Sequence, residues 1–255
     1  MRLCNCIPFK PSTSSDCGSI CPGVNVSFVN DDWSWNLECL PPYSKLSGPD
    51  NRTVIFNEIW SFGTAGIQGD KRLTRDTIAY WEVFVSHRVF GTALMFGIGA
   101  KQGYLYANDF CHMIGDNAHS WGLCHKGLLW HGSISVRFCE PFEEFKPTKI
   151  AMLFDGPAGT LRFWKDDQDL GIGFANMFEH HDGPFYPMVS STAAKTEMTL
   201  GRRLQNTQRL RRLSDAAAIS VLLNLTSRSA ICDLPLPADS KRTLQQKWDD
   251  FRTSD

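Results

Sequence analysis

Short apolar runs recur through the middle of the chain, from about residue 28 to residue 203. Ten of them are rich in β-branched and aromatic residues and are separated by Gly, Asp, Asn and Pro: RTVIFNEI, AYWEVFVSH, TALMFGIGA, SWGLCHKGLLWHG, SVRFCE, KIAMLFDG, TLRFWKD, LGIGFA, FYPMVSST and KTEMTLG. Strands at this spacing, with turn signals between them, are typical of a sandwich or barrel. The pattern therefore predicts an all-β domain.

Two of the connections can be specified. DGPAGT, residues 155–160, joins two strand-like runs, and Gly156 and Gly159 are available there for positive φ. The segment LRFWKDDQDLGIGFA, residues 161–175, reads as a hairpin with a polar turn. Its acidic residues could suggest a calcium loop, but their spacing fits no EF-hand, so a turn is preferred.

The two ends of the chain have a different character. Residues 1–27 are rich in Ser, Pro, Gly and Cys without periodicity, which predicts a flexible tail. Residues 204–255 contain many helix formers, and apolar residues fall at helical spacing on both sides of an LPLP segment: Leu210, Leu213, Ala217 and Val221 before it, Leu244, Trp248 and Phe251 after it. A module of this size buries its own apolar faces poorly. It is either an appendage packed on the β domain or a docking element for a partner.

The composition, with 42% hydrophobic residues, is that of a folded soluble protein. With 26 basic and 27 acidic residues, the net charge gives no support for nucleic acid or an anionic membrane as partner. No apolar run approaches the roughly 20 residues that span a bilayer, and the N-terminus shows no apolar signal-peptide region. We therefore expect an intracellular protein, cytoplasmic or nuclear.

The nine cysteines and the histidines offer little chemistry. An odd number of cysteines without a signal peptide favours reduced thiols, and the four in the first 21 residues lack a usual zinc spacing. Cys111-His112 and Cys124-His125 are neighbours in sequence, which would point them to opposite faces of a strand. No G-x-S-x-G, H-E-x-x-H or P-loop occurs. We expect no catalytic residue, no metal and no cofactor.

Several segments of the β region occur in an order that resembles a SPRY domain. They are AYWEVFV (79–85), MFGIGA (95–100), DNAHSWGL (116–123), LFDGPAGTLRFWKD (153–166), LGIGF (170–174) and FYPMVS (185–190). The resemblance covers nearly all of residues 28–203. It implies a bent sandwich of two antiparallel sheets, with loops at one end forming a protein- or peptide-binding surface and no catalytic residues.

The C-terminal segment, residues 204–255, resembles a SOCS box through LSDAAAISV (213–221) and the LPLP that follows. The resemblance implies that a first, Elongin B/C-binding helix uses Leu213, Ala217 and Val221. It also implies that Leu234, Pro235, Leu236 and Pro237 select a cullin-5 scaffold. Ala217 stands where the family usually has Cys, and Arg212 stands where it usually has Ser, Thr or Pro. A leucine–proline segment is stiff before binding, so it loses little entropy on docking.

A SPRY domain followed by a SOCS box is the architecture of the SPRY-domain SOCS-box proteins. The resemblance implies a non-catalytic substrate-recognition subunit of a cullin-5-type ubiquitin ligase. Its partners would be Elongin B, Elongin C, cullin-5 with its RING protein, and a protein target with a short peptide degron. The alternative is a SPRY interaction adaptor without ligase attachment.

Peptide specificity does not transfer with the resemblance. Family members bind an Asn-rich peptide with an Arg/Pro/Ala segment, a loop Tyr and a Val-Trp-Gly turn. By position, this chain has Asn57, Ile59 and Ser61, then Phe110, then Thr192, Ala193 and Ala194. None matches, so only the location of the recognition surface is carried over. Phe110 either anchors the target or closes the end of the sandwich.

Overall fold

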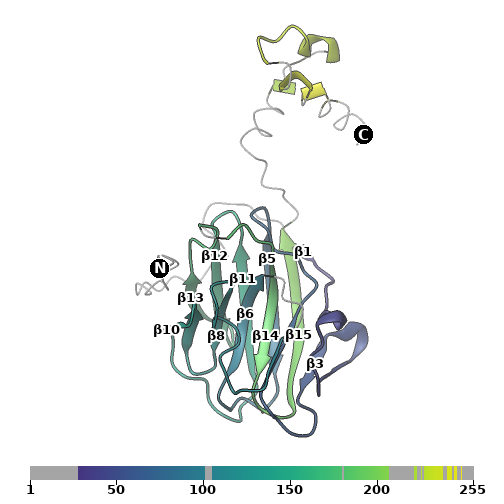
Figure 1. The fold of residues 1–255 in the computed structure, drawn as a ribbon. Coiled ribbons are helices and arrows are strands. Elements are labelled where there is room, and N and C mark those ends of the chain that lie inside the picture. Colours follow the sequence, from purple (N-terminus) through teal and green to yellow (C-terminus); the bar gives the residue numbers. More distant parts are fainter. Residues whose placement is uncertain are drawn as a thin grey trace. The chain divides into compact units, whose positions relative to one another are not determined.

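The computed structural model of this chain describes residues 28–100, 105–179, 181–206, 221–222, 225, 227–237, 240–242, 244–245 and 248. The chain forms two compact units, Met1–Thr207 and Gln208–Asp255. The regular secondary structure in the described part of the first unit is almost entirely β-strand (Figure 1).

Two antiparallel sheets make up this first unit. In the first sheet the order is β13-β12-β11-β5-β15-β3-β2, and β1 also pairs with β15. Its strands are β1 (Phe28–Asn30), β2 (Lys45–Ser47), β3 (Thr53–Phe56), β5 (Ile78–Val85), β11 (Thr148–Asp155), β12 (Thr160–Lys165), β13 (Gln168–Phe174) and β15 (Thr196–Asn206).

The second sheet has the order β10-β9-β8-β6-β14-β4-β7. Its strands are β4 (Thr64–Gln68), β6 (Leu94–Ala100), β7 (Tyr106–Ala107), β8 (Ser120–Cys124), β9 (Leu128–His131), β10 (Ile134–Arg137) and β14 (Phe185–Ser191). Short 3-10 turns lie at η1 (Leu37–Cys39) and η2 (Pro49–Asn51). The expected all-β antiparallel sandwich is confirmed.

The core lies between the sheets and follows from the alternation of side chains along each strand. On β5, Trp81, Val83 and Val85 are buried in this core, whereas Phe84 between them is exposed. The strand β6 is buried on both faces. Phe96 joins the main core, whereas Met95 joins a second cluster with Leu105, Ile114, Cys124 and Met188. The segment around residues 105–114 thus covers the outer face of the second sheet.

The two turns that were specified from the sequence are confirmed. DGPAGT connects β11 to β12, and the polar turn after Lys165 connects β12 to β13 in an antiparallel hairpin. Asp166 and Asp167 adopt φ of 48° and 68°, the backbone of a two-residue hairpin turn. The Asp166 carboxylate accepts from the Thr148 hydroxyl and the Lys149 N–H, both on β11, at 3.0 and 2.9 Å.

Two predicted strands have different limits in the structure. RTVIFNEI was expected to be one strand, but β3 ends at Phe56 because Asn57 has a φ of 50°, which breaks the extended backbone. SWGLCHKGLLWHG contains two strands, β8 and β9, with a turn at Gly127. Both differences matter below, because they place residues in loops instead of strands.

The described residues of the second unit form their own small core. Leu222, Ile231 and Leu244 are buried together, and Trp248 packs against them. Residues 221–222 and 240–242 are helical, and η3 spans Arg228–Ile231. The expected tail at 1–27 and most of the expected first helix lie outside the described residues.

Candidate functional site

Loops from both sheets meet at one end of the sandwich. The end of β3 pairs with the start of β15, since Phe56 lies opposite Thr196. In the other sheet, Thr64 at the start of β4 lies opposite Ala107 at the end of β7. Three segments therefore come together at the end of the sandwich where β15 begins. They are the β3–β4 loop (57–63), the segment after β7 (108–111) and the β14–β15 turn (192–195).

Hydrogen bonds fix these loops to one another. Ser61 Oγ donates to the Thr192 carbonyl at 2.5 Å, and the Lys195 N–H donates to the Asn57 carbonyl at 2.9 Å. Asn57 Nδ2 lies 3.3 Å from Ser61 Oγ and donates to it. The β3–β4 loop is thus tied to a turn more than a hundred residues away in sequence.

The segment after β7 is held from the other side. Thr64 Oγ1 donates to the Asp109 carbonyl at 2.7 Å and accepts from the Cys111 N–H at 2.9 Å. A Cβ on Gly63 would lie 2.0 Å from the Ala107 carbonyl oxygen, so only glycine permits this close approach. The surface that these loops present is therefore built on a rigid framework.

Five large apolar side chains project from this framework into solvent. They form what we call the aromatic patch: Tyr43 (62% exposed), Ile59 (73%), Trp60 (70%), Phe62 (62%) and Phe110 (53%). The Tyr43 ring lies 6.1 Å from that of Phe62 and 6.3 Å from that of Tyr106. Clustered exposed aromatic residues are typical of a protein-interaction site.

The residues predicted from the family resemblance divide into two groups. Ile59 and Phe110 are exposed and belong to the aromatic patch. Asn57, Thr192 and Ala193 are buried, and Ser61 and Ala194 are half-buried. This second group positions the loops, as the hydrogen bonds of Ser61 and Asn57 show, and its buried members, Asn57, Thr192 and Ala193, are closed to a partner.

Sequence reasoning missed Tyr43, Trp60 and Phe62. The signal was present in EIWSFG, where apolar residues continue past the end of a strand up to a glycine. Apolar side chains in a loop have no strand face on which to be buried. The strand expected over RTVIFNEI ends at Ile59, and the exposure of Trp60 and Phe62 beyond it was not predicted.

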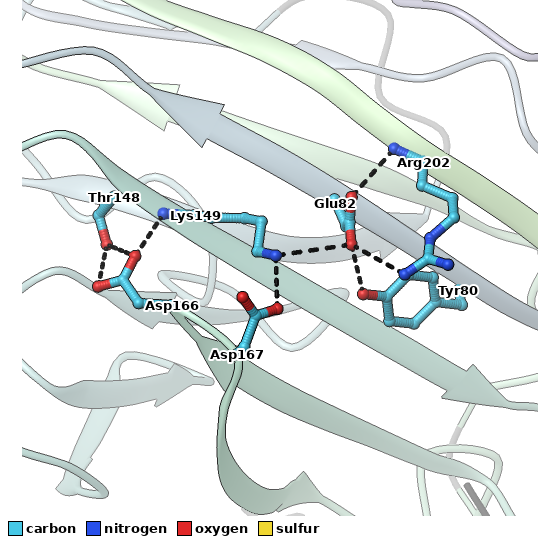
Figure 2. A network of polar contacts seen from close by, with 7 residues as sticks. All are labelled: Tyr80, Glu82, Thr148, Lys149, Asp166, Asp167 and Arg202. Atoms are coloured by element: carbon cyan, nitrogen blue, oxygen red, sulfur yellow. Dashed lines mark hydrogen bonds and ion pairs between the residues drawn. The ribbon is translucent and has the colours of Figure 1, made fainter.

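A network of polar contacts, separate from the aromatic patch, lies on the outer face of the first sheet (Figure 2). The Glu82 carboxylate is largely buried, accepts from Tyr80 Oη at 2.8 Å and from the Arg202 N–H at 3.2 Å, and lies 3.9 Å from Lys149 Nζ. Lys149 Nζ also pairs with Asp167 at 2.5 Å. The network crosses β5, β11, β15 and the β12–β13 turn.

The charged groups of this network are paired with groups of opposite charge within it. Glu82 stabilises the phenol form of Tyr80, whose pKa is raised, first by burial and then by the hydrogen bond to Glu82. Two shallow grooves of about 420 and 220 Å³ flank the network, the first beside Phe84 and Pro147, the second beside Tyr80 and Trp164. Since its charged groups are paired internally, we interpret the network as support for the sheet.

Cys124 and His125 were expected to point to opposite faces of a strand, and this is wrong. β8 ends at Cys124, so His125 begins a turn and its Nδ1 lies 3.5 Å from Cys124 Sγ. Burial raises the pKa of the Cys124 thiol and lowers the pKa of His125 to about 4, to which the charge of Lys126 contributes. A nucleophilic pair needs the opposite shifts, a thiolate beside an imidazolium. The two groups form a neutral buried contact.

This burial predicts a pH-dependent stability. The folded protein holds the pKa of His125 below its ordinary value of 6.5, so the unfolded chain binds more protons between pH 6.5 and about 4. The contribution of neutral His125 to the free energy of unfolding is fully present above pH 6.5 and is lost as the pH falls from 6.5 toward 4. We expect urea unfolding to report a loss of about 2 kcal/mol from His125 between pH 7 and pH 5.

The matched variant is His125→Asn, which keeps an acceptor for the Leu94 N–H that His125 Nδ1 now receives at 3.1 Å. Its stability should change less over the same pH range. An unchanged slope in the variant would contradict the assignment to His125. Burial also lowers the pKa values of His112 and His131. These two residues therefore destabilise wild type and His125→Asn alike as the pH falls.

In the part of the chain that the structure describes, no three His, Cys, Asp or Glu side chains are grouped as a metal site would require. The same residues include no helix of the length and apolarity that crossing a membrane takes.

The C-terminal residues expected to bind partners are only partly described. Leu213 and Ala217 lie outside the described residues, and Val221 is half-buried. Leu234 packs against the cluster of Leu222, Ile231 and Leu244. By contrast, the side chains of Pro235, Leu236 and Pro237 are exposed. The LPLP segment thus has one leucine turned inward and the remainder accessible.

A model of the SPRY domain matches residues 78–203 of this chain. That range contains most strands of both sheets, and it ends within β15. Together with the two-sheet sandwich, the match makes the chain a SPRY-domain protein.

Along most of its length the chain is similar to SPRY domain-containing SOCS box protein 3. It is 32% identical to the Xenopus tropicalis protein over 218 residues, which cover 85% of this chain and 58% of that protein. The identity to the Xenopus laevis protein is also 32%, over 94% of this chain and 63% of that protein. The predicted resemblance is thus confirmed. The chain spans about three fifths of the length of these two relatives.

The solved structure titled as the TRIM65 PSpry domain aligns with 67% of this chain and 92% of its own length. The identity is 20% and the TM-score is 0.49.

Proposed function

We propose that this protein is the substrate-recognition subunit of a cullin-5-type Elongin B/C ubiquitin ligase. The aromatic patch and the loops around it hold a target protein through a short peptide degron. The box at residues 204–255 attaches the target to the ligase. The chain does no chemistry itself. It promotes ubiquitination by raising the effective concentration of target lysines near the loaded ubiquitin carrier.

The observation that carries the proposal is the aromatic patch on a SPRY domain. Large apolar side chains are normally buried, and a group of them held in solvent by a hydrogen-bonded loop framework has a free-energy cost that a partner offsets. Binding energy at interfaces concentrates in a few such residues. The similarity to proteins named for a SOCS box, over most of this chain, supports the second half of the proposal.

In the second unit, the division of the LPLP segment supports cullin attachment. Leu234 fixes the segment to the unit's own core, whereas Leu236 remains 39% exposed. Two prolines restrict the backbone around it. A partner would therefore meet a preformed apolar side chain and lose little entropy in binding it.

The test is co-expression of the full chain with Elongin B and Elongin C, followed by size-exclusion chromatography. The wild type should elute as a stable ternary complex. Leu213→Asp should lose it, because a carboxylate would be buried in the proposed helix interface. Wild-type protein that elutes alone would instead favour a SPRY interaction adaptor without ligase attachment.

Leu236→Asp is the matched control. It makes the same change at an exposed position outside the proposed Elongin-binding helix. This variant should retain Elongin B and C but fail to recruit cullin-5 with its RING protein in the same chromatographic assay. Loss of Elongin from both variants would contradict the separate roles of the two segments.

A further inference from the structure

Arg88, in the loop between β5 and β6, lies at the edge of the recognition surface. Its Nε donates to the Ala194 carbonyl at 2.7 Å, so the guanidinium contacts the same β14–β15 turn that Ser61 contacts. A Cβ on Gly91, which has a φ of 103°, would lie 2.9 Å from Thr192 Oγ1. The β5–β6 loop therefore packs closely on the turn to which the β3–β4 loop, with its aromatic residues, is also bonded.

The Arg88 side chain is held in place by aromatic rings. Its guanidinium carbon lies 4.8 Å from the centre of the Phe90 ring. Phe90 in turn stacks on Phe145, with ring centres 5.1 Å apart and an interplanar angle of 30°. Phe145 is 62% exposed. A cation stacked on an aromatic ring keeps its orientation at little further entropic cost.

No carboxylate neutralises this guanidinium among the residues that the structure describes. Several other arginines do pair with a carboxylate: Arg52, Arg75, Arg162, Arg202 and Arg203. Arg88 makes one hydrogen bond through Nε and is half-buried. Its two terminal nitrogens make no ion pair with a described carboxylate, and two parallel N–H donors match the two oxygens of a carboxylate from a partner.

The charges nearby favour an acidic ligand. Lys195, the next residue after Ala194, is exposed and adds a second positive charge to the turn. On the neighbouring loop, Glu143 is neutralised by Lys146 at 2.8 Å. At the aromatic patch, Glu58 is paired with Lys45 at 3.2 Å. The turn itself therefore carries two positive charges, from Arg88 and Lys195, and no carboxylate of its own.

From this arrangement we propose that the recognised peptide carries an Asp or Glu side chain beside an aromatic or aliphatic one. The carboxylate pairs with Arg88, and the apolar side chain packs on the aromatic patch across the β14–β15 turn. This inference rests on the proposed function, because it names the class of segment that the same surface selects. Charge complementarity sets the orientation of the peptide, and the apolar contact supplies most of its affinity.

The experiment selects ligands for the full chain from a phage-displayed library of random linear dodecapeptides. A selected peptide is then synthesised with a fluorophore and titrated by fluorescence polarisation. We expect selected sequences to contain Asp or Glu next to an aromatic or aliphatic residue. Changing that acidic residue to its amide should weaken binding about ten- to a hundredfold, the range for a charge-assisted hydrogen bond.

Arg88→Gln should weaken binding of the acidic peptide by a similar factor, and the amide peptide should not discriminate between wild type and variant. Arg75→Gln is the matched control, since Arg75 also stacks on a phenylalanine, Phe178, at 4.5 Å and donates to a backbone carbonyl. It lies before β5, at the other end of the sandwich. The amide peptide tests the proposal on unaltered protein, so the result does not depend on how Arg88→Gln folds.

Two failures are distinguishable. In the first, the selected peptides lose binding to Trp60→Ala, show no preference for an acidic residue and bind Arg88→Gln within twofold of wild type. This result overturns the inference and leaves the proposed recognition surface in place. Peptides that ignore both Trp60→Ala and Arg88→Gln, or a library that yields no ligand, overturn the inference together with the proposed surface.

Discussion

Trp60→Ala should weaken binding of a selected peptide or target by about thirtyfold or more while leaving the stability of the protein unchanged. The side chain is 70% exposed, so its removal deletes little packing in the free protein. In a complex the same ring would be desolvated within the aromatic patch. Truncation of a tryptophan that a partner fully covers typically costs about 2 kcal/mol or more of binding free energy, about thirtyfold in Kd.

The measurement combines fluorescence polarisation with thermal unfolding of the same preparations. Trp164→Ala is a suitable control, because Trp164 is half-buried on the outer face of the first sheet, where its ring contacts that of Tyr80 and none of the patch residues. It should leave binding intact. Equal affinity of wild type and Trp60→Ala for a target that is captured by the SPRY domain would place recognition elsewhere on the domain.

Trp121→Ala should have the opposite effect, a severe loss of stability. Trp121 on β8 is fully buried. Its ring stacks on His131 at 4.6 Å with an interplanar angle of 7° and meets the edge of Phe185 at 4.9 Å. Truncation of a buried tryptophan leaves a large cavity, and we expect a cost of about 3–5 kcal/mol. Against a typical total of about 5–15 kcal/mol, this leaves little folded protein at elevated temperature.

Urea unfolding of the full chain at pH 7, followed by tryptophan fluorescence and far-UV circular dichroism, measures this cost. Trp121→Phe should lose less, because a phenyl ring retains part of the stacking on His131. Trp60→Ala serves as the same substitution at an exposed position, with an expected change within about 0.5 kcal/mol. A loss below 1 kcal/mol in Trp121→Ala would show that the cavity collapses or that the ring contributes little packing.

Trp60 and Trp121 show that local sequence does not predict which tryptophan is buried. Each tryptophan stands in an apolar run, EIWSF and SWGLC, and local pattern gives no reason to separate them. SWGLC is enclosed because β8 pairs with β6 on one side and β9 on the other. EIWSF begins after Asn57 has turned the chain out of β3. Burial therefore depends on pairings between distant segments.

The site residues divide for the same reason. Ile59 and Phe110, which the family resemblance assigns to the recognition loops, are exposed. Thr192 and Ala193, predicted with them, are enclosed by the β5–β6 and β3–β4 loops. Arg88 gave no signal in the sequence, because its relation to Ala194 spans more than a hundred residues. A position in a family motif thus indicated a group of loops, but not which of their side chains are accessible.

The sequence alone determined the all-β class, most of the strands, two hairpin turns and the family resemblance, because alternation, turn residues and motif order are local properties. The short strands β1, β2, β4 and β7 were not predicted. Only the tertiary structure decided which aromatic side chains remain in solvent and which loops carry them. It alone placed an arginine without a carboxylate partner, among the described residues, beside those loops. These features depend on hydrogen bonds and contacts between residues far apart in the chain, such as Ser61 with Thr192 and Arg88 with Ala194.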